Sequence, residues 1–507
     1  MKHPRDFPAT PATPLRSLIA WREGGLMSQL GDGFFEHVSA EPVEAPHWVG
    51  RSHALAKQLG LTDWMASDDA LAVLSGTGLG PGQPPPLATA YSGHQFGVWA
   101  GALGDGRALL LGEIDTPLGP QELQLKGSGA TPFSRRGDGR AVLRSSIREF
   151  LCSESMAALG VPTTRALAVV GSPLPVFRET QETAAIVTRV APSFLRFGHF
   201  EHHCHTTRDP ARLRQLADAV IERFFGPLLE QTEPGVRPYR LWLQEVSRRT
   251  AQLIAQWQSL GFCHGVMNTD NMSILGLTLD YGPFGFMDGF NPGHICNHSD
   301  HQGRYAWGRQ PQIAYWNLHA LAMALRPLFD DPQEPGDAIE VFKSEFHTAW
   351  SHQLKSKLGL QSNGPDDEEL ARDWLGLMAD HRTDFTLAFR ALSSVRRDHP
   401  EVPAGLSDLF IDREALKAWV DRYRARLTLE QTDDAQRAVQ MNQVNPRYVL
   451  RNHLAEVAIE SARQGDFSEV QRLLGVLAHP YDEQPENASY AALPPSWAED
   501  LEISCSS

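Results

Sequence analysis

The spacing of apolar residues changes once along this chain, near residue 199. Before that point, short apolar runs bounded by Gly, Asp or Pro predict strands; after it, apolar residues recur at helical spacing over long stretches. A small mixed lobe followed by a large helical lobe is a two-lobed α+β architecture. We expect four parts: an N-terminal extension, a small lobe, a helical lobe, and a C-terminal helical extension with a tail, over 1–85, 86–198, 199–400 and 401–507.

Turn-forming residues set the boundaries of these parts. Residues 80–86 contain two glycines and four prolines, which excludes regular structure and predicts a linker. The predicted strands of the small lobe are 96–103, 107–114, 122–126, 166–170 and 184–190, and its one predicted helix is 140–159. The predicted helices of the second part are 210–225, 240–260, 312–328, 338–358, 367–390, 413–427 and 452–464.

Charge and cysteine content restrict the class of protein. Lys and Arg number 46 against 61 Asp and Glu, and the net charge of −15 disfavours a surface that binds nucleic acid or an anionic membrane. Five cysteines without regular spacing predict no disulfide framework. The first 20 residues lack the apolar run of a secretory signal, and no run approaches the ~18 apolar residues of a membrane helix. We expect a cytoplasmic monomer with no nucleic-acid and no membrane partner.

Two glycine-containing segments of the small lobe are candidates for binding a phosphate. Gly104 and Gly106 lie in the turn between the first two predicted strands, where backbone N–H groups can approach an anion; a plain Asp-Gly hairpin turn is the alternative. Residues 134–140 hold three arginines and two glycines at the entrance of the predicted helix. Guanidinium groups beside a helix N-terminus favour an anion cradle, with a basic surface turn as the alternative.

A lysine and a glutamate form a candidate pair for contacting a phosphate. Lys126 ends a predicted strand on the face opposite Leu125, and Glu149 borders the apolar stripe of the following helix. A strand lysine followed by a helix glutamate is the layout that holds the phosphate-contacting lysine of protein kinases. For Lys126 taken alone, a solvated lysine at a sheet edge is the alternative.

The most specific pattern is the run 264–271, HGVMNTDN, followed by Asp-Tyr-Gly at 280–282. Against the kinase patterns H-R-D-L-x-x-x-N and D-F-G, Asn271 and Asp280 take the places of the metal-binding residues. Val266 stands where a kinase has its catalytic Asp, so the pattern predicts ATP bound with Mg²⁺ or Mn²⁺ but lacks the base of a kinase. The nearby carboxylate able to act instead is Asp270.

Two clusters of histidine and cysteine are interpreted as loops rather than as metal sites. Adjacent side chains rarely point at one ion, and neither cluster has the paired spacing of a zinc finger. The second cluster follows the Asp280 motif, where a kinase has its activation loop. The clusters are His199, His202, His203, Cys204 and His205, and His294, Cys296, His298 and His301.

Together these motifs resemble the selenoprotein O family of pseudokinase-fold protein adenylyltransferases. The resemblance runs from about residue 30 to the C-terminus and rests on the segments 91–97 (YSGHQFG), 103–107, 124–140, 264–271 and 280–283. It implies a protein-kinase-like two-lobed fold and transfer of AMP from ATP to Ser, Thr or Tyr hydroxyls of other proteins and of the chain itself, with release of pyrophosphate. It also implies that the nucleotide binds in reverse relative to kinases. Uridylyl transfer from UTP is left open as a further activity.

The resemblance assigns roles to single residues as well. Arg189 and Arg196 match arginines that line the pocket for the β- and γ-phosphates, and guanidinium groups suit a departing pyrophosphate. The full set of implied ATP contacts is Gly104, Gly106, Arg107, Lys126, Asp138, Gly139, Arg189, Arg196 and Asp280.

The resemblance implies three further roles: orienting the lysine, binding the metal ion and accepting the proton of the acceptor hydroxyl. Glu149 would orient Lys126, Asn271 and Asp280 would ligate Mg²⁺ or Mn²⁺, and Asp270 would be the catalytic base. Two other functions fit the same residues. A kinase-type phosphotransferase would need a carboxylate in place of Val266, and an inactive nucleotide-binding scaffold would have little need of a complete metal site.

Cys505 is a thiol near the C-terminus, where some members of the family carry a selenocysteine. We predict a labile regulatory disulfide between Cys505 and Cys296, since both are expected to be exposed, one near the chain end and one in the loop after Asp280. Two unrelated thiols are the alternative. Reductant should then raise transfer activity in the wild type but not in Cys505→Ser. Peptide maps of oxidised protein should contain the Cys296–Cys505 pair. The switch is refuted if no such pair is found and if both proteins have the same activity with and without reductant.

Overall fold

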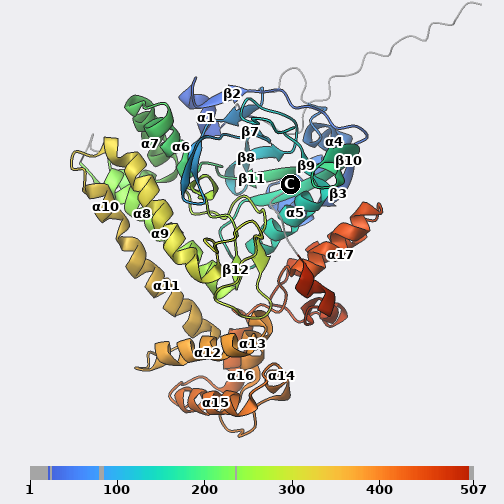
Figure 1. The fold of residues 1–507 in the computed structure, drawn as a ribbon, viewed down its shortest axis with the longest axis vertical. Helices are drawn as coiled ribbons and strands as arrows, with labels where there is room; N and C mark the ends of the chain where they lie inside the picture. Colours follow the sequence, from blue (N-terminus) through green and yellow to red (C-terminus); the bar gives the residue numbers. More distant parts are fainter. Residues whose placement is uncertain (1–20, 23–24, 79–84, 234–236, 502–507) are drawn as a thin grey trace, which may run out of the picture.

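The computed structural model describes residues 21–22, 25–78, 85–233 and 237–501. Figure 1 shows a large sheet at one end of the molecule and the helices of the second half of the chain beside and below it. The predicted change from a β-rich part to a helical part is therefore confirmed. Most of the linker predicted at 80–86 lies outside the described residues.

The sheet is antiparallel and has nine strands within the described residues. Its main path runs in the order β2-β4-β7-β8-β11-β10-β3, with β1 beside β7 and β9 beside β11. The strands are β1 (Trp21–Arg22), β2 (Phe35–His37), β3 (His47–Arg51), β4 (Leu87–Thr89), β7 (Ala108–Thr116), β8 (Gly119–Lys126), β9 (Ala141–Val142), β10 (Arg165–Phe177) and β11 (Gln181–Ala191). Four of the five predicted strands are confirmed as β7, β8, β10 and β11.

The predicted strand 96–103 is not part of this sheet. Its second half forms β6 (Val98–Ala102), which pairs with β5 (Ser92–Gln95) in a separate two-stranded sheet. Phe96 and Gly97 form the turn between them, with φ of +51° and +79°. Positive φ at both central residues gives a turn whose twist matches a hairpin, so the chain reverses where the sequence pattern predicted a continuous strand.

Residues before 86 take part in the sheet. β3 forms its edge beside β10, where Trp48 is paired with Val170. Four helices accompany these strands, and Ser52 begins the second by accepting a hydrogen bond from the N–H of Leu55 at 3.2 Å. They are α1 (Gly25–Leu30), α2 (His53–Gln58), α3 (Thr62–Met65) and α4 (Asp68–Leu74). Elements this short show no clear periodicity, which is why the sequence did not indicate them.

Helices cover both faces of the sheet. On one face, Leu55 and Trp64 pack with Leu125 of β8. On the other, α5 (Leu143–Ala158) crosses β10 and β11 and buries Phe150. Because successive residues of a strand point to opposite faces, β8 directs Leu125 to the first face and Lys126 to the face that α5 covers. This confirms the alternation predicted for Lys126.

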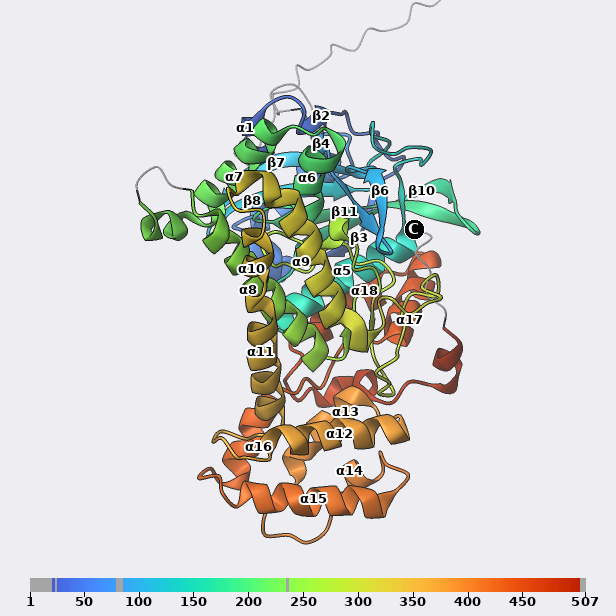
Figure 2. The ribbon, with the colours of Figure 1, turned by 60° about the vertical axis from the view of Figure 1, so that its left-hand side comes forward.

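Two helices of the C-terminal part pack against α5. The helices α17 (Asn452–Arg463) and α18 (Ser468–Leu477) lie beside it (Figure 2). Arg148 of α5 donates to the carbonyl of Phe284 at 2.7 Å, and the Tyr481 hydroxyl donates to the carbonyl of Leu159 at 3.0 Å. The last helices therefore fix the position of α5 against the sheet.

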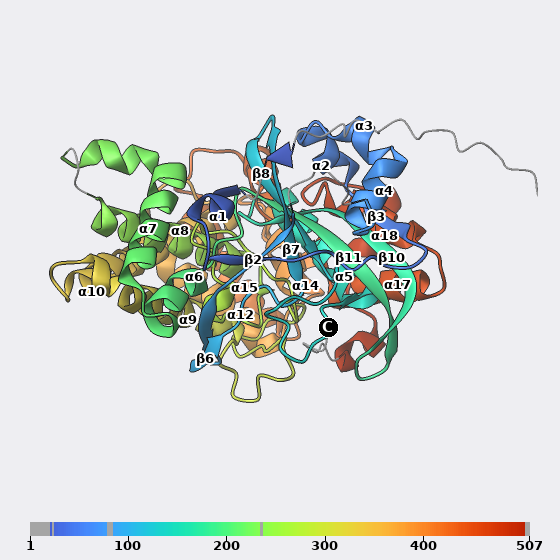
Figure 3. The ribbon, with the colours of Figure 1, turned by 90° about the horizontal axis from the view of Figure 1, so that it is seen from above.

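The second half is mainly helical, as predicted, except for the loops and two short strands between residues 262 and 306. Figure 3 shows α7–α10 on one side of the sheet and α17 and α18 on the other. The helices are α6 (Phe197–Glu201), α7 (Pro210–Phe224), α8 (Tyr239–Ser259), α9 (Gln310–Leu325), α10 (Glu334–Ile339), α11 (Val341–Lys357), α12 (Asp367–His381), α13 (Phe385–Ala391), α14 (Ala404–Ser407), α15 (Arg413–Leu427) and α16 (Asp434–Asn442). Among the described helices, none is both long and apolar enough to cross a membrane.

The helix predicted over 367–390 is two helices, α12 and α13. Arg382 has a φ of +49°, a left-handed conformation that ends α12. Asp384 then begins α13, because its Oδ1 accepts a hydrogen bond from the N–H of Leu387 at 2.9 Å. Apolar residues continue at helical spacing across this break, so periodicity alone predicted one helix.

The run 199–205, predicted as a loop, is also helical. It covers the end of α6 and a π-helix, η1 (His202–Thr206). The imidazole of His199 contacts Thr89 Oγ1 at 3.1 Å and the N–H of Arg196 at 3.0 Å. Within the described ranges, no group of three or more His, Cys, Asp or Glu side chains is arranged to hold a metal ion.

The helix α11 leads away from the sheet to a group formed by α12–α16 (Figure 1). This group has an aromatic core in which Trp374 and Trp419 have ring centroids 4.5 Å apart. Lys357, at the end of α11, is 3% exposed, and its Nζ lies 4.4 Å from the ring centroid of Phe389. Burial lowers the pKa of Lys357 to about 7.

A lysine with a lowered pKa makes stability depend on pH. Between about pH 7 and 10.5 the unfolded chain binds more protons at Lys357 than the folded chain does, so the penalty is complete below pH 7 and fades toward pH 10.5. We predict that Lys357→Met raises the free energy of unfolding at about pH 6 by ~1–3 kcal/mol and that the gain shrinks toward about pH 10. Urea unfolding at both pH values measures this, with the exposed Lys417→Met as the control. A loss of stability at the lower pH would contradict it.

Candidate nucleotide and metal site

A cavity of about 680 Å³ is lined by residues of the sheet and by loops at 264–283. It gathers segments that lie far apart in the sequence. The predicted site residues that line it are Gly104, Gly106, Arg107, Lys126, Asp138, Gly139, Arg189, Arg196, Asp270, Asn271 and Asp280. Glu149 is buried and contacts Lys126, and Cys296 does not line the cavity.

Two short strands bring the loop residues together. β12 (Phe262–Cys263) and β13 (Gly285–Phe286) pair antiparallel, and the segment between them contains both predicted metal ligands. The Nε2 atom of His264 lies 2.9 Å from the carbonyl oxygen of Leu279. Burial lowers the pKa of His264 to about 4, so the ring is neutral and Nε2–H donates to that carbonyl. This bond ties the start of the motif to the Asp280 segment.

Glu149 is shared by two cations. Its Oε2 lies 2.5 Å from Lys126 Nζ, and its Oε1 accepts from Nε of Arg189. Burial opposes ionisation of the carboxyl, but Arg189 and Lys126 outweigh it and lower the pKa of Glu149 to about 2. Burial lowers the pKa of Lys126, an effect that the Glu149 carboxylate opposes. The glutamate therefore stays ionised and holds both cations on the α5 face of the sheet.

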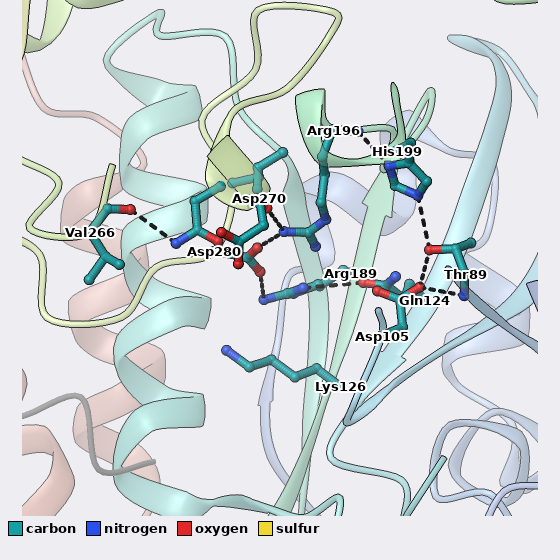
Figure 4. Close-up of polar contacts among 12 residues, drawn as sticks. Thr89, Asp105, Gln124, Lys126, Arg189, Arg196, His199, Val266, Asp270 and Asp280 are labelled. Atoms are coloured by element: carbon teal, nitrogen blue, oxygen red, sulfur yellow. Dashed lines mark hydrogen bonds and ion pairs between the residues drawn. The ribbon is translucent and has the colours of Figure 1, made fainter. Parts of the chain in front are cut away.

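Asp280 faces two arginines across the cavity. Arg189 Nη2 lies 2.8 Å from its Oδ1, and Arg196 Nη1 contacts its Oδ2; Figure 4 shows both side chains pointing toward it. Asp280 has a φ of +61°, which is uncommon outside glycine. Sparsely populated backbone conformations cluster at active sites and ligand clamps, so this geometry supports a functional role for Asp280.

The oxygens of Asn271 and Asp280 fit a divalent cation. The Nδ2 of Asn271 donates to the carbonyl of Val266 at 3.0 Å, which leaves Oδ1 as the acceptor atom of that side chain. The Asp280 side chain is 21% exposed and opens onto the cavity. Carboxylate and amide oxygens are the ligands that Mg²⁺ and Mn²⁺ prefer.

Asp270 lies in the short 3₁₀ helix η3 (Thr269–Asn271) at the cavity wall. Its Oδ2 accepts from Nε2 of Gln95 at 3.1 Å, and no donor among the described residues reaches its Oδ1. Burial raises the pKa of Asp270 to about 6, and the Gln95 bond and the charge of Arg196 oppose that rise. A carboxylate with a raised pKa is suited to accept a proton near neutral pH.

The loop of Gly104 and Gly106 joins β6 to β7, which belong to different sheets, so the plain hairpin considered for it is wrong. Gly104 has a φ of +80°, and a Cβ there would lie 2.3 Å from Cγ of Phe133. Asp105 holds the loop in place, because its Oδ2 accepts from the N–H and the hydroxyl of Thr89 at 2.9 and 2.5 Å. The glycine turn is therefore a fixed part of the cavity wall.

The segment 134–140 also lines the cavity. Arg178 donates to both carboxylate oxygens of Asp138 at 2.8 and 2.9 Å and so attaches the segment to the β10–β11 turn. α5 begins at Leu143, after β9, so the helix N-terminus expected at residue 140 does not belong to this segment. Arginine side chains and turn backbone remain as the predicted anion-binding groups there.

Comparison with known proteins places the chain in a family. The sequence model described as "Protein adenylyltransferase SelO" matches residues 22–478. The chain belongs to this family. It is therefore an enzyme of the nucleotidyltransferase class, and the resemblance found in the sequence is confirmed.

Full-length relatives in the SelO family carry the name "Protein nucleotidyltransferase YdiU". The one from Paraburkholderia xenovorans is 54% identical over 98% of both chains. Those from Cupriavidus metallidurans and Burkholderia pseudomallei are each 53% identical, over 95% and 99% of this chain and 91% and 98% of the relative.

The expectation that the Cys296 thiol is exposed is wrong for this SelO member. Cys296 is 8% exposed, and its Sγ–H donates to the carbonyl of Cys263 at 3.3 Å. Burial raises the pKa of Cys296 well above its usual value, which disfavours a reactive thiolate. Cys505 lies outside the described residues, so the pairing of the two cysteines stays a prediction.

The cavity is also lined by Tyr91, Gln95 and Arg178, polar residues to which the residue patterns gave no role. The guanidinium of Arg196 lies 5.1 Å from the ring centroid of Tyr91. Tyr91 and Gln95 belong to the segment 91–97, which marked the family resemblance but matches no chemical motif. Arg178 stands alone in a turn, and no sequence signal indicates its contact with Asp138.

Lys126→Ala should reduce nucleotidyl transfer by ~10²-fold or more, because a positive charge beside the phosphates is lost. Arg189 still neutralises Glu149 in this variant, so the fold should persist. Initial rates with α-labelled nucleotide measure the effect, and the exposed Lys343→Ala serves as the control. A rate near that of the wild type would show that Lys126 does not contact the nucleotide.

Proposed function

We propose that this SelO-family enzyme transfers AMP from ATP to Ser, Thr or Tyr hydroxyls of target proteins and of itself, and releases pyrophosphate. The observation that carries this proposal is the convergence of Lys126, Arg189 and Arg196, at most 7% exposed, at the buried side of the cavity. Cations placed there suit the charge that develops on a departing pyrophosphate. The β- and γ-phosphates then lie inward, and the α-phosphate remains accessible to an acceptor.

In the proposed reaction the acceptor oxygen attacks the α-phosphorus, and the bond from the α-phosphorus to the bridging oxygen of the β-phosphate breaks. Asp270 accepts the acceptor's hydroxyl proton, and Lys126, Arg189 and Arg196 stabilise the pyrophosphate that leaves. Asn271 and Asp280 would hold Mg²⁺ or Mn²⁺, which when bound offsets phosphate charge. Uridylyl transfer from UTP uses the same phosphate contacts and is part of the proposal.

The two-lobed kinase-like arrangement is proposed with the function. Residues of both 86–198 and 199–400 line the cavity, which supports two lobes around one nucleotide. Residues 1–85 and 401–507 are then the extensions of these lobes, and of the described residues in the first, β2 and β3 join the small-lobe sheet. Ion pairing of Lys126 with Glu149 and the place of Asn271 and Asp280 support the kinase-like pattern, and Val266 supports the description as a pseudokinase.

The four cysteines in the described residues, none of them in a disulfide, support a cytoplasmic location.

We predict that label from the α-phosphate of ATP, and not from the γ-phosphate, becomes covalently attached to protein and that pyrophosphate is released. The physical reason is the proposed placement of the cations around the β- and γ-phosphates, which form the leaving group, with the α-phosphorus left accessible to the acceptor. Parallel incubations with the two labels, with Asp280→Ala as the inactive control, measure this. Transfer of γ-label with release of ADP would instead support a phosphotransferase, and ATP binding with no transfer would support a scaffold.

A further inference from the structure

The β5–β6 hairpin carries the segment 91–97, to which the mechanism above gives no part. It lies against the residues 268–271, called the Asp270 loop here. The N–H of His94 donates to Thr269 Oγ1 at 2.8 Å, and the N–H of Phe96 donates to Asn268 Oδ1 at 3.1 Å. The hairpin backbone thus holds two consecutive side chains of the Asp270 loop.

Close packing between the hairpin and the Asp270 loop depends on glycine. A Cβ at Gly93 would lie 2.8 Å from Thr269 Oγ1 and 3.2 Å from Asp270 Oδ1. A Cβ at Gly198 would lie 2.2 Å from the carbonyl oxygen of Ser92. Any side chain at either position would push β5 away from the Asp270 loop or from α6.

The hairpin turn is strained and held in place. Phe96 has a φ of +51°, a left-handed conformation that is uncommon and strained in a residue other than glycine. Its N–H also donates to the hydroxyl of Tyr305 at 2.9 Å, and that hydroxyl contacts Asn268 Oδ1 at 2.5 Å. Strain maintained by surrounding contacts at the wall of a site points to a functional constraint on the turn.

Gln95 stands between His94 and Phe96 and directs its side chain at the predicted base. Its Nε2 donates to Asp270 Oδ2 at 3.1 Å, whereas no donor in the described ranges reaches Oδ1. The backbone of Asp270 is held separately, because Arg196 Nη1 donates to its carbonyl at 2.7 Å. The amide of Gln95 therefore sets the rotation of a carboxylate whose main chain is already fixed.

We propose that Gln95 is a positioning residue for AMP transfer, which fixes the rotation of the Asp270 carboxylate at the cavity wall, where that carboxylate accepts the proton of the acceptor hydroxyl. This inference rests on the proposed function. Without the Gln95 donor, a carboxylate that is 7% exposed loses the amide partner of its Oδ2, which favours rotation toward Arg196. A misplaced base slows the chemical step more than it weakens ATP binding.

Gln95→Met tests this, because methionine has nearly the same length and no donor. In α-label transfer assays we expect kcat to fall by ~10–10²-fold, while KM for ATP changes by less than about twofold. Because Gln95 acts through Asp270, adding Gln95→Met to Asp270→Asn should reduce kcat no further. Val98→Ala is the matched control: Val98 is paired with Gln95 in the hairpin, is 69% exposed, and should leave kcat unchanged.

The outcomes separate this inference from the function it rests on. If the wild type transfers α-label but Gln95→Met has wild-type kcat, or if its loss multiplies with that of Asp270→Asn, the positioning role is wrong. If the wild type transfers no α-label, the proposed function fails and the inference fails with it. Should Gln95→Met not fold, Gln95→Leu removes the donor without adding a charge, and the same loss of kcat is expected.

Discussion

The carboxylate of Glu149 is the group on which the arrangement of the cavity depends. It contacts Lys126 of β8 and Arg189 of β11, strands that are neighbours in the sheet, and Arg189 in turn reaches Asp280. Breaking a buried ion pair by removing one partner costs about 3–5 kcal/mol, since the remaining charge is left without compensation. One glutamate on α5 therefore holds the side chains of Lys126 and Arg189 together at the same cavity.

The position of α5 depends in turn on the end of the chain. α17 and α18 pack on α5, and Arg148, next to Glu149, reaches the carbonyl of Phe284 just beyond the Asp280 segment. The guanidinium of Arg148 also lies 4.4 Å from the centroid of the Phe284 ring. The helices α17 and α18, the Glu149 pair and the Asp280 segment thus form one packed unit, which gives these two helices a structural role at the cavity.

Sequence reasoning predicted the parts of this site that follow from local patterns. Alternation along β8 placed Lys126 opposite Leu125, and helical spacing placed Glu149 on α5. Other features depend on contacts between segments that are distant in the sequence. Arg178 and Asp138 are 40 residues apart, and Gln95 and Asp270 are 175 residues apart. No periodicity encodes such contacts. Local patterns also failed where the backbone takes positive φ at residues other than glycine, as at Phe96 and Arg382.

The most direct test is a crystal structure with Mn²⁺ and an ATP analogue that carries a methylene between the α- and β-phosphorus atoms. It shows whether the nucleotide is bound for release of pyrophosphate or for release of ADP. We predict that the β- and γ-phosphates contact Lys126, Arg189 and Arg196, that the metal contacts Asn271 and Asp280, and that the α-phosphorus is the one nearest Asp270. A γ-phosphorus nearest Asp270, with the arginines on the α-phosphate, would contradict adenylyl transfer and indicate a kinase-like orientation.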